Sequence, residues 1–286
     1  MKKIIFASLA ALSLAAPLQA QAQEAKLLGI KGLSANVGAV SDYRFRGITQ
    51  TFGTSALQVG VDYAHDSGLY IGNWNSNINE GAGYPSAHIE SDVYGGFKKS
   101  LGEISVDLGL ITYLYSKSNS TNAVTANRML TNARTGNVAR GDVDNTEAYG
   151  ALSWKWLTVK YSRALSNYFS VPDTRGTSYL DLAGNWDLGN GWGVNSHVGL
   201  LRYMGLNTST VNGDYNDYKI GVTKEMLGVV LGASYISTDA KAGNCTLGNF
   251  GTTSVNFYCY TDNLGDPKSV KNAGAGTLVL SVMKTF

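Results

Sequence analysis

The chain has 286 residues, of which 44% are hydrophobic and 15% are charged, with 34 glycines, 17 tyrosines and four prolines. Its 23 Lys and Arg residues exceed its 21 Asp and Glu residues only by Lys2 and Lys3. Such a balance argues against a nucleic-acid partner, because nucleic acid requires a basic surface. An excess of glycine and tyrosine over charged residues is typical of twisted β-sheets with aromatic rims.

The N-terminus has the pattern of a secretory signal peptide. Met1-Lys2-Lys3 is basic, residues 4–16 are apolar, and Ala20-Gln21-Ala22 is a small-residue cleavage motif. We expect residues 1–22 to be removed and residues 23–286 to form one domain. That remainder has no run of 18 apolar residues, so it predicts no transmembrane helix. If it spans a membrane it must be a closed barrel, because only helices and barrels satisfy every backbone polar group in lipid.

Apolar and polar residues alternate with a period of two along most of the chain, which indicates strands. The first predicted strand covers residues 33–46, with one face formed by Leu33, Ala35, Val37, Ala39, Tyr43 and Phe45 and the other by Asn36, Asp42, Arg44 and Arg46. Further strands are predicted at residues 57–64, 69–75, 89–98, 104–114, 146–154, 157–163, 180–186, 192–200, 216–224, 228–237 and 276–286.

The connections between these strands alternate between short and long. Tight turns are predicted near residues 66, 101, 155, 189 and 226, and longer loops near residues 50, 81, 130, 170, 210 and 255. This layout, with an even strand number, predicts an all-β fold: a transmembrane antiparallel up-and-down β-barrel of about 12 strands. Aromatic residues near the predicted strand ends fit interfacial girdles, namely Tyr43, Tyr63, Tyr113, Trp154, Trp186, Trp192 and Tyr235.

The last predicted strand ends in Phe286 with nothing after it. An amphipathic last strand that ends in Phe resembles the assembly signal of outer-membrane barrels, so we expect Phe286 to be recognised by the barrel-assembly machinery. Lys284 departs from that signal, which usually has an apolar residue there. For these residues alone, the closing strand of a soluble β protein is the alternative.

Three segments resemble recurring blocks of the TorF family of porin-like proteins, conserved bacterial outer-membrane proteins of the Gcw_chp type. They are residues 41–51 (SDYRFRGITQT), 69–77 (LYIGNWNSN) and 90–97 (ESDVYGGF), and the match is strongest over residues 34–115. The resemblance implies a channel-like protein of the cell outer membrane, and it implies no functional residues.

A charged side chain that faces lipid at mid-depth would cost roughly 2–4 kcal/mol, so the charged faces of the strands are expected to face the lumen. The predicted inward residues are Asp42, Arg44, Arg46, Asp62, Glu90, Asp92, Lys98, Asp107, Lys160, Asp181, Asn195, His197, Asp217 and Lys219. They would either line a water channel with acidic and basic sides or pair across a filled interior that conducts nothing.

Two arginines in the first strand are the candidate selectivity residues. Arg44 and Arg46 are two residues apart, so both should point to one face near the mouth, together with Asp42. They would form one side of a constriction, opposed by inward carboxylates such as Asp62, Glu90 or Asp92. The alternative is a structural ion-pair network that holds those strands together.

Cys245 and Cys259 are the two cysteines, and in an oxidising compartment such a pair predicts a disulfide in the last long loop. Free thiols are the alternative. A metal site would need more ligands, and we expect neither a metal nor a cofactor.

The sequence therefore predicts an outer-membrane porin-like channel for passive diffusion of small hydrophilic solutes, in contact with outer-membrane lipid and lipopolysaccharide. The alternative is a receptor, adhesin or structural barrel that acts through its external loops, especially residues 238–273. We do not expect an enzyme. A hydrolase around His197 and Asn195 would need a nucleophile, and Ser196 is predicted to point outward.

Overall fold

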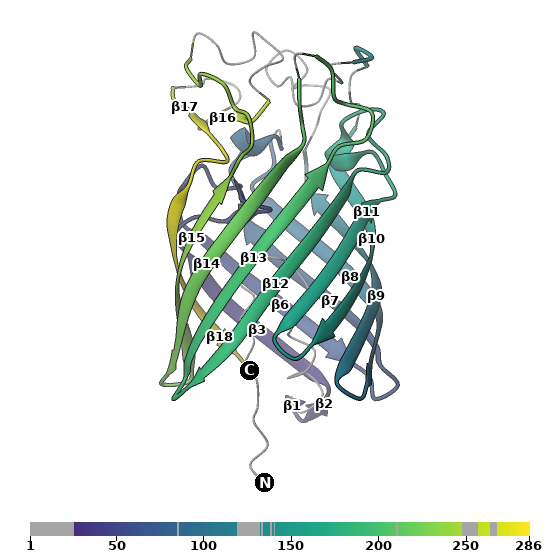
Figure 1. Cartoon of the computed structure of the whole chain (residues 1–286), viewed down its shortest axis with the longest axis vertical. Helices are drawn as coiled ribbons and strands as arrows, with labels where there is room; N and C mark the ends of the chain where they lie inside the picture. The colour runs from purple at the N-terminus through teal and green to yellow at the C-terminus, as the bar shows by residue number, and fades with distance from the viewer. Residues whose placement is uncertain are drawn as a thin grey trace.

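The computed structural model describes residues 26–84, 86–118, 132, 134–137, 139, 141–209, 211–247, 257–263 and 268–286. The predicted signal peptide lies outside the described residues. Within them, twelve strands form one closed antiparallel barrel in which each strand pairs with its neighbours along the chain (Figure 1). The strands are β3 (Leu33–Val40), β6 (Ala56–Ala64), β7 (Leu69–Asn77), β8 (Ile89–Leu101), β9 (Ile104–Tyr115), β10 (Asp144–Trp154), β11 (Leu157–Ala164), β12 (Ser178–Gly189), β13 (Trp192–Arg202), β14 (Tyr215–Met226), β15 (Val229–Thr238) and β18 (Thr277–Thr285). The predicted barrel is confirmed.

The last strand closes the barrel. β18 lies between β15 and β3, and its register with β3 runs from Ser281 opposite Val40 to Thr285 opposite Asn36. One residue further, the backbone N–H of Phe286 donates to the carbonyl of Ala35 at 2.8 Å. The chain end is therefore part of the seam, whereas its role as an assembly signal stays a prediction.

Side chains alternate between an apolar outer surface and a polar interior, as the period of two predicted. On β6, Leu57 and Val61 are exposed, while Gln58 and Asp62 are buried. Exposed leucines, isoleucines and valines recur on the strands around the barrel, and this belt is the lipid-facing surface of a transmembrane barrel. In the described part of the chain, no helix is long and apolar enough to cross a membrane.

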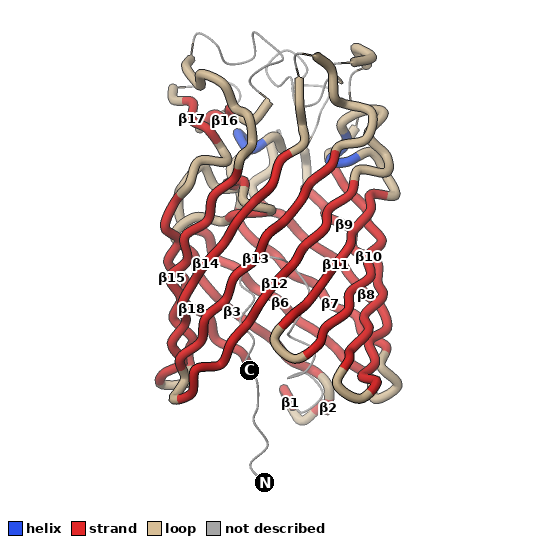
Figure 2. Tube along the Cα trace, in the orientation of Figure 1, coloured by secondary structure: helices blue, strands red, loops and turns tan. Residues whose placement is uncertain are grey.

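The two ends of the barrel differ. Short turns join the strands at one end, where the C-terminus lies, and longer segments lie at the other (Figure 2). In the turn between β14 and β15, Leu227 and Gly228 both have left-handed backbones, with φ of 53° and 71°. Two consecutive positive φ values suit a two-residue hairpin, because such a turn follows the twist of the strands.

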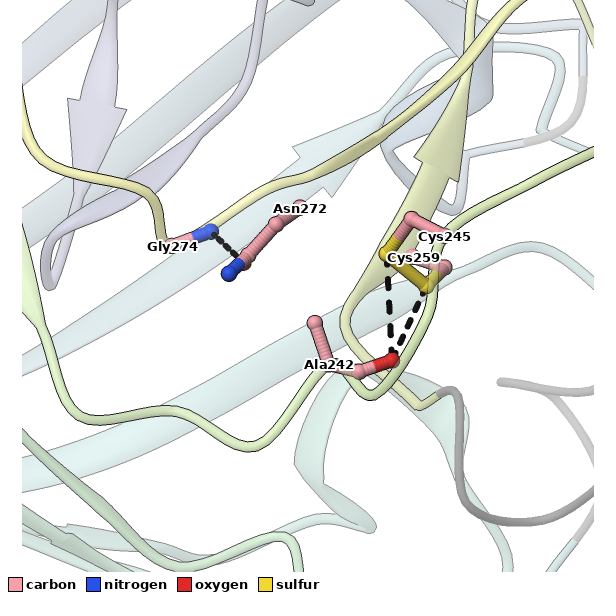
Figure 3. Close-up of a disulfide and its surroundings, with 5 residues drawn as sticks. All are labelled: Ala242, Cys245, Cys259, Asn272 and Gly274. Atoms are coloured by element: carbon pink, nitrogen blue, oxygen red, sulfur yellow. Dashed lines mark hydrogen bonds between the residues drawn. A yellow bond between two sulfur atoms is a disulfide. The ribbon is translucent and has the colours of Figure 1, made fainter.

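Short elements lie outside the barrel sheet. The strands pair as β1 (Lys26–Leu27) with β2 (Ile30–Lys31), β4 (Arg44–Phe45) with β5 (Ile48–Thr49), and β16 (Cys259–Thr261) with β17 (Val270–Asn272). Within the described ranges, the 3-10 turns η1 (Glu80–Ala82) and η3 (Tyr168–Ser170) lie in the longer connections. At the end with the longer loops, Cys245 and Cys259 form the predicted disulfide, with the carbonyl oxygen of Ala242 beside both sulfurs (Figure 3).

Two predictions about the strands are wrong in part. The first strand ends at Val40 rather than at residue 46, because the chain turns inward there and Arg46 and Gly47 take left-handed backbones. Two of the seven predicted girdle aromatics, Tyr43 and Tyr113, are buried inside instead. Tyr43 lies beyond the strand end, and Tyr113 has the opposite parity to the outward-facing Leu114. The other five lie exposed on the outer surface.

Candidate functional site

The inner wall carries most of the predicted inward residues. Asp62, Glu90, Asp92, Asp107, Asp181, Asn195 and Asp217 are buried on it, and Lys98, Lys160, His197 and Lys219 are half-buried. Strand register places opposite charges side by side: Lys98 is the cross-strand partner of Asp107, and Lys160 that of Asp181. His197 Nε2 lies 2.8 Å from Asp217 Oδ1. The inner wall thus carries both acidic and basic side chains. Its role as a pore lining stays a prediction.

Tyrosines cover part of this wall and donate hydrogen bonds to several of its carboxylates. Tyr94 Oη donates to Asp62 at 2.5 Å, and Tyr70 Oη donates to Asp107 at 2.7 Å. Glycines make room for the rings: a Cβ at Gly72 would lie 2.4 Å from Tyr94 Cε2. The rings therefore fill lumen space close to the wall, and the carboxylates of Asp62 and Asp107 each keep a hydrogen bond that offsets their burial.

A loop crosses the lumen. Residues 41–55 leave the end of β3 and contact three separate sectors of the wall. Tyr43 Oη donates to Glu90 of β8 at 2.9 Å, Arg46 pairs with Glu147 of β10, and Tyr215 of β14 donates to the Arg46 carbonyl at 2.9 Å. In the barrel order, β10 is five strands from β3 in one direction and β14 is three in the other. We call residues 41–55 the crossing loop.

Arg46 is the far anchor of the crossing loop. Its Nη1 and Nη2 donate to the two carboxylate oxygens of Glu147 at 3.0 and 2.7 Å, and Nη1 also donates to Tyr168 Oη at 2.9 Å. The guanidinium lies 4.2 Å from the ring centroid of Tyr179. Arg46 is 7% exposed and Glu147 is 1% exposed, so both charges are out of water and depend on each other.

Arg44 holds the near side of the same loop. Its Nε donates to Asp42 at 2.6 Å, and its Nη1 donates to the carbonyls of Gly47, Ala273 and Ala275 at 3.0 Å each. These contacts join the loop to the segment that enters β18.

The two arginines therefore do not form one face, which corrects the sequence-based placement. Beyond Val40 the chain leaves the barrel sheet, so the period of two no longer decides which side chains face the lumen. Within the described residues, neither arginine forms an ion pair with a predicted opposing carboxylate: Asp62 accepts from Tyr94 and Glu90 accepts from Tyr43, whereas Arg46 pairs with Glu147. That Asp62, Glu90 or Asp92 oppose the arginines across a constriction stays a prediction.

Aromatic side chains fill the mouth around the crossing loop. Tyr84 stacks on Tyr115 with ring centroids 3.8 Å apart, and Phe169 packs against both. A cavity of about 50 Å³ remains among them, lined by Phe45, Ile48, Gln50, Ala82, Gly83, Tyr84, Tyr168, Phe169, Val171, Leu201, Tyr203, Tyr215, Tyr258 and Tyr260.

Glu147 and Tyr168 were missed in the sequence. Glu147 lies in the predicted strand 146–154, and its parity is that of Ala151 and opposite to that of the outward-facing Leu152. The rule that selected the other inward charges would have selected it. Tyr168 lies in a loop without a period, so no local pattern indicates its direction.

Similarity to solved structures is low in sequence. The KdgM porin matches with a TM-score of 0.48 and 5% identity over 88% of this chain and 99% of its own. The NanC porin matches with a TM-score of 0.45 and 9% identity, over 88% of this chain and 98% of its own. Pseudomonas aeruginosa OpdL matches with a TM-score of 0.38 and 10% identity, over 90% of this chain and 68% of its own. No curated protein matches the chain. The TorF name stays a prediction. A family model described as "Bacterial protein of unknown function (Gcw_chp)" matches residues 24–286, and the chain therefore belongs to the Gcw_chp family.

Proposed function

We propose that this protein is an outer-membrane channel for passive diffusion of small hydrophilic solutes, with the crossing loop as its constriction. The observation that carries the proposal is a loop that spans a lumen lined by ionisable side chains of both signs. Lys98, Lys160 and Lys219 are mostly buried but keep some accessible surface, and we take this part of the lumen to be the hydrated part. The crossing loop then separates this hydrated part of the lumen from the end with the longer loops.

The location follows from the outer surface. The exposed apolar belt contacts outer-membrane lipid, and lipopolysaccharide surrounds the end with the longer loops. The short-turn end faces the periplasm. The protein is exported by its signal peptide and inserted by the barrel-assembly machinery, which reads the strand that ends in Phe286.

Permeation through this lumen is weakly charge-selective. The partly exposed residues Lys98, His197 and Lys219 line the path. The buried residues Asp62, Glu90, Asp92, Asp107, Asp181 and Asn195 contribute to the potential of the wall, and Asp42, Arg44 and Arg46, buried in the crossing loop, contribute to the potential of the constriction. Lys98 lies opposite Asp107 and Lys160 opposite Asp181 on neighbouring strands, so neither ion sign meets a uniform potential along the wall. Solute size at the crossing loop then sets what passes.

A receptor, adhesin or structural barrel without an open pore is the second candidate. One observation favours it: at the level of the crossing loop the inward side chains are buried, including Asn145, Glu147 and Tyr113. We do not propose an enzyme. His197 is held by Asp217, and an orienting acid without a positioned nucleophile does not constitute a catalytic site.

Planar-bilayer recording tests the proposal. The folded protein is compared with a variant in which residues 43–53 are replaced by a short glycine-containing turn. A channel narrowed by the crossing loop gives small conductance steps with the wild type and larger steps with the variant. In liposome-swelling assays, the variant should also admit larger sugars. If both proteins are folded and neither conducts, the channel is rejected in favour of a role for the external loops.

A further inference from the structure

The ring of Phe169 occupies a cage of other aromatic rings at the mouth. Its centroid lies 4.7 Å from that of Tyr168, 5.5 Å from those of Phe45 and Tyr113, and 6.0 to 6.2 Å from those of Tyr115 and Tyr84. The Phe169 ring is T-shaped to the rings of Phe45, Tyr84 and Tyr168 and tilted to those of Tyr113 and Tyr115. Aromatic pairs prefer such edge-to-face arrangements over face-to-face stacking. This arrangement surrounds a single six-membered ring.

The backbone that delivers this ring is strained. Phe169 and Ser170 have φ of 46° and 58°, and two consecutive non-glycine residues in the left-handed region are uncommon. Strain of this kind persists only where surrounding contacts enforce it, and it is concentrated at binding sites and switches. A rearrangement of residues 168–171 that withdraws the Phe169 ring would release the strain and open the cage into the adjacent cavity.

The adjacent cavity offers hydroxyl groups to a ligand. Tyr203 and Tyr260 line it, and within the described part of the chain neither hydroxyl makes a hydrogen bond. Gln50 lines it too and already accepts a hydrogen bond from Tyr84 at 2.9 Å. At about 50 Å³ the cavity holds about one or two waters, well below the roughly 150 Å³ that accommodates benzene. A ring ligand therefore fits only where Phe169 has left.

Charge narrows the ligand class. Aromatic cages attract cations, but the guanidinium of Arg46 already lies 4.8 Å from the Phe45 centroid and 5.7 Å from that of Tyr168. A second cation would be repelled. An anion gains nothing there either, because the two Nη donors of Arg46 are bonded to Glu147.

We propose that this cage and cavity form a binding site for an uncharged six-membered ring bearing hydroxyl groups, with Phe169 as its intramolecular occupant. The solute ring takes the place of the Phe169 ring, and its hydroxyls bond to Tyr203, Tyr260 and Gln50. The inference deepens the proposed function and rests on it in one respect: only if the protein is a channel does binding at this site capture a solute at the channel entrance. Binding itself requires no open pore.

Calorimetric titration of the folded protein in detergent tests the site with three probes: phenol, methyl β-glucoside and glycerol. At least one of the two ring probes should bind, and glycerol, which has hydroxyls but no ring, should not. Phe169→Ala should tighten binding by roughly fivefold or more, because it removes the competing occupant. Tyr260→Phe should weaken it roughly two- to tenfold, the effect of one uncharged hydrogen bond. The lipid-facing controls Phe97→Ala and Tyr235→Phe should change nothing.

The results separate this inference from the channel. If a ring probe binds but the protein shows no conductance in planar bilayers, the binding site is supported and the open pore is rejected. If the protein conducts but no ring probe binds to the wild type or to Phe169→Ala, the binding site is rejected. Phenol alone, or the glucoside alone, identifies the ring as aromatic or sugar. Glycerol binding as tightly as the rings overturns the ring specificity. If Phe169→Ala fails to fold, Phe169→Leu replaces it, and unchanged affinity in both Phe169→Leu and Tyr260→Phe overturns the site.

Discussion

Removing the Arg46 side chain should release the far end of the crossing loop without unfolding the barrel. Arg46→Ala leaves Glu147 buried without its cation, and deletion of one partner of a buried ion pair typically costs about 3–5 kcal/mol. The lost hydrogen bond to Tyr168 adds about 1 kcal/mol. The strand-to-strand hydrogen bonds of the barrel do not involve either side chain, so the cost falls on the docked state of the loop.

A loss of about 3–5 kcal/mol shifts the ratio of docked to released loop by roughly 10²- to 4 × 10³-fold, at about 1.4 kcal/mol per tenfold. Single-channel recording should show longer or larger open levels, and limited proteolysis should cut within residues 41–55. The matched control is Lys31→Ala. Lys31 and Asp66 have the same 2.7 Å separation as the Arg46 pair, but their side chains are more than 60% exposed, and water screens such pairs. The barrel should remain heat-modifiable in both variants.

The two arginines of the crossing loop, Arg44 and Arg46, determine the direction in which ion selectivity should change. Arg44→Ala combined with Arg46→Ala removes two cations and leaves Asp42 and Glu147 uncompensated, so the anion-to-cation permeability ratio should fall. Adding Glu147→Gln should move the reversal potential part of the way back. If Arg46→Ala matches the wild type in conductance, proteolysis and reversal potential, the crossing loop is not held by this pair and the reasoning fails.

Three further outcomes follow from the barrel and its loops. Deleting Phe286 should lower the yield of heat-modifiable protein, because it removes the last hydrogen-bonded pair of the closing seam; normal insertion would reject the assembly role. Replacing Cys245 and Cys259 by Ser should leave the gel shift intact but increase protease cleavage of the last loop, since a link across about 15 residues is worth about 3 kcal/mol. Unreduced peptide mass spectra showing two free thiols would contradict the disulfide itself. Gly72→Ala should lower stability against denaturant by about 1–3 kcal/mol by pressing a methyl group on the tyrosine ring that covers it, and Gly150→Ala, with one flexible neighbour, should cost less. Equal stability of both glycine variants would show that the ring yields freely.

The barrel could be predicted from the sequence because alternation is a local property. Each strand shows its own period of two, and the short turns show their own residues, so strand number, pairing order and the closing strand need no long-range information. Lys284 illustrates a tolerated departure: it lies on the apolar parity of the last strand but near its end, with its Nζ 5.7 Å from the Phe286 ring centroid. A lysine there reaches the membrane–water interface.

The crossing loop could not be predicted because its sequence continues the alternation after the strand has ended. Asp42, Arg44 and Arg46 keep the parity of Asn36, so a period count places them on the barrel wall. What redirects the chain is a set of distant contacts, including a partner of Arg46 that lies 101 residues away. No local pattern contains that separation. The direction of Tyr113 could have been predicted, because its parity is opposite to that of the outward-facing Leu114. Only its position near a strand end places it in the predicted aromatic girdle.

The barrel wall follows from local sequence patterns, whereas the crossing loop is held by distant contacts. This difference decides in which part of the molecule substitutions can alter selectivity while the barrel stays intact. The wall is a continuous hydrogen-bonded sheet on which several inward charges contact neighbouring strands or tyrosines, so a single substitution there disturbs those contacts as well as the lumen. The crossing loop reaches the far wall through Arg46, Tyr43 and the tyrosine that holds the Arg46 carbonyl, and all of these are side-chain contacts. Such contacts can be exchanged one at a time while the sheet stays closed. Selectivity in this protein is therefore expected to reside in residues 41–55 and the side chains that receive them.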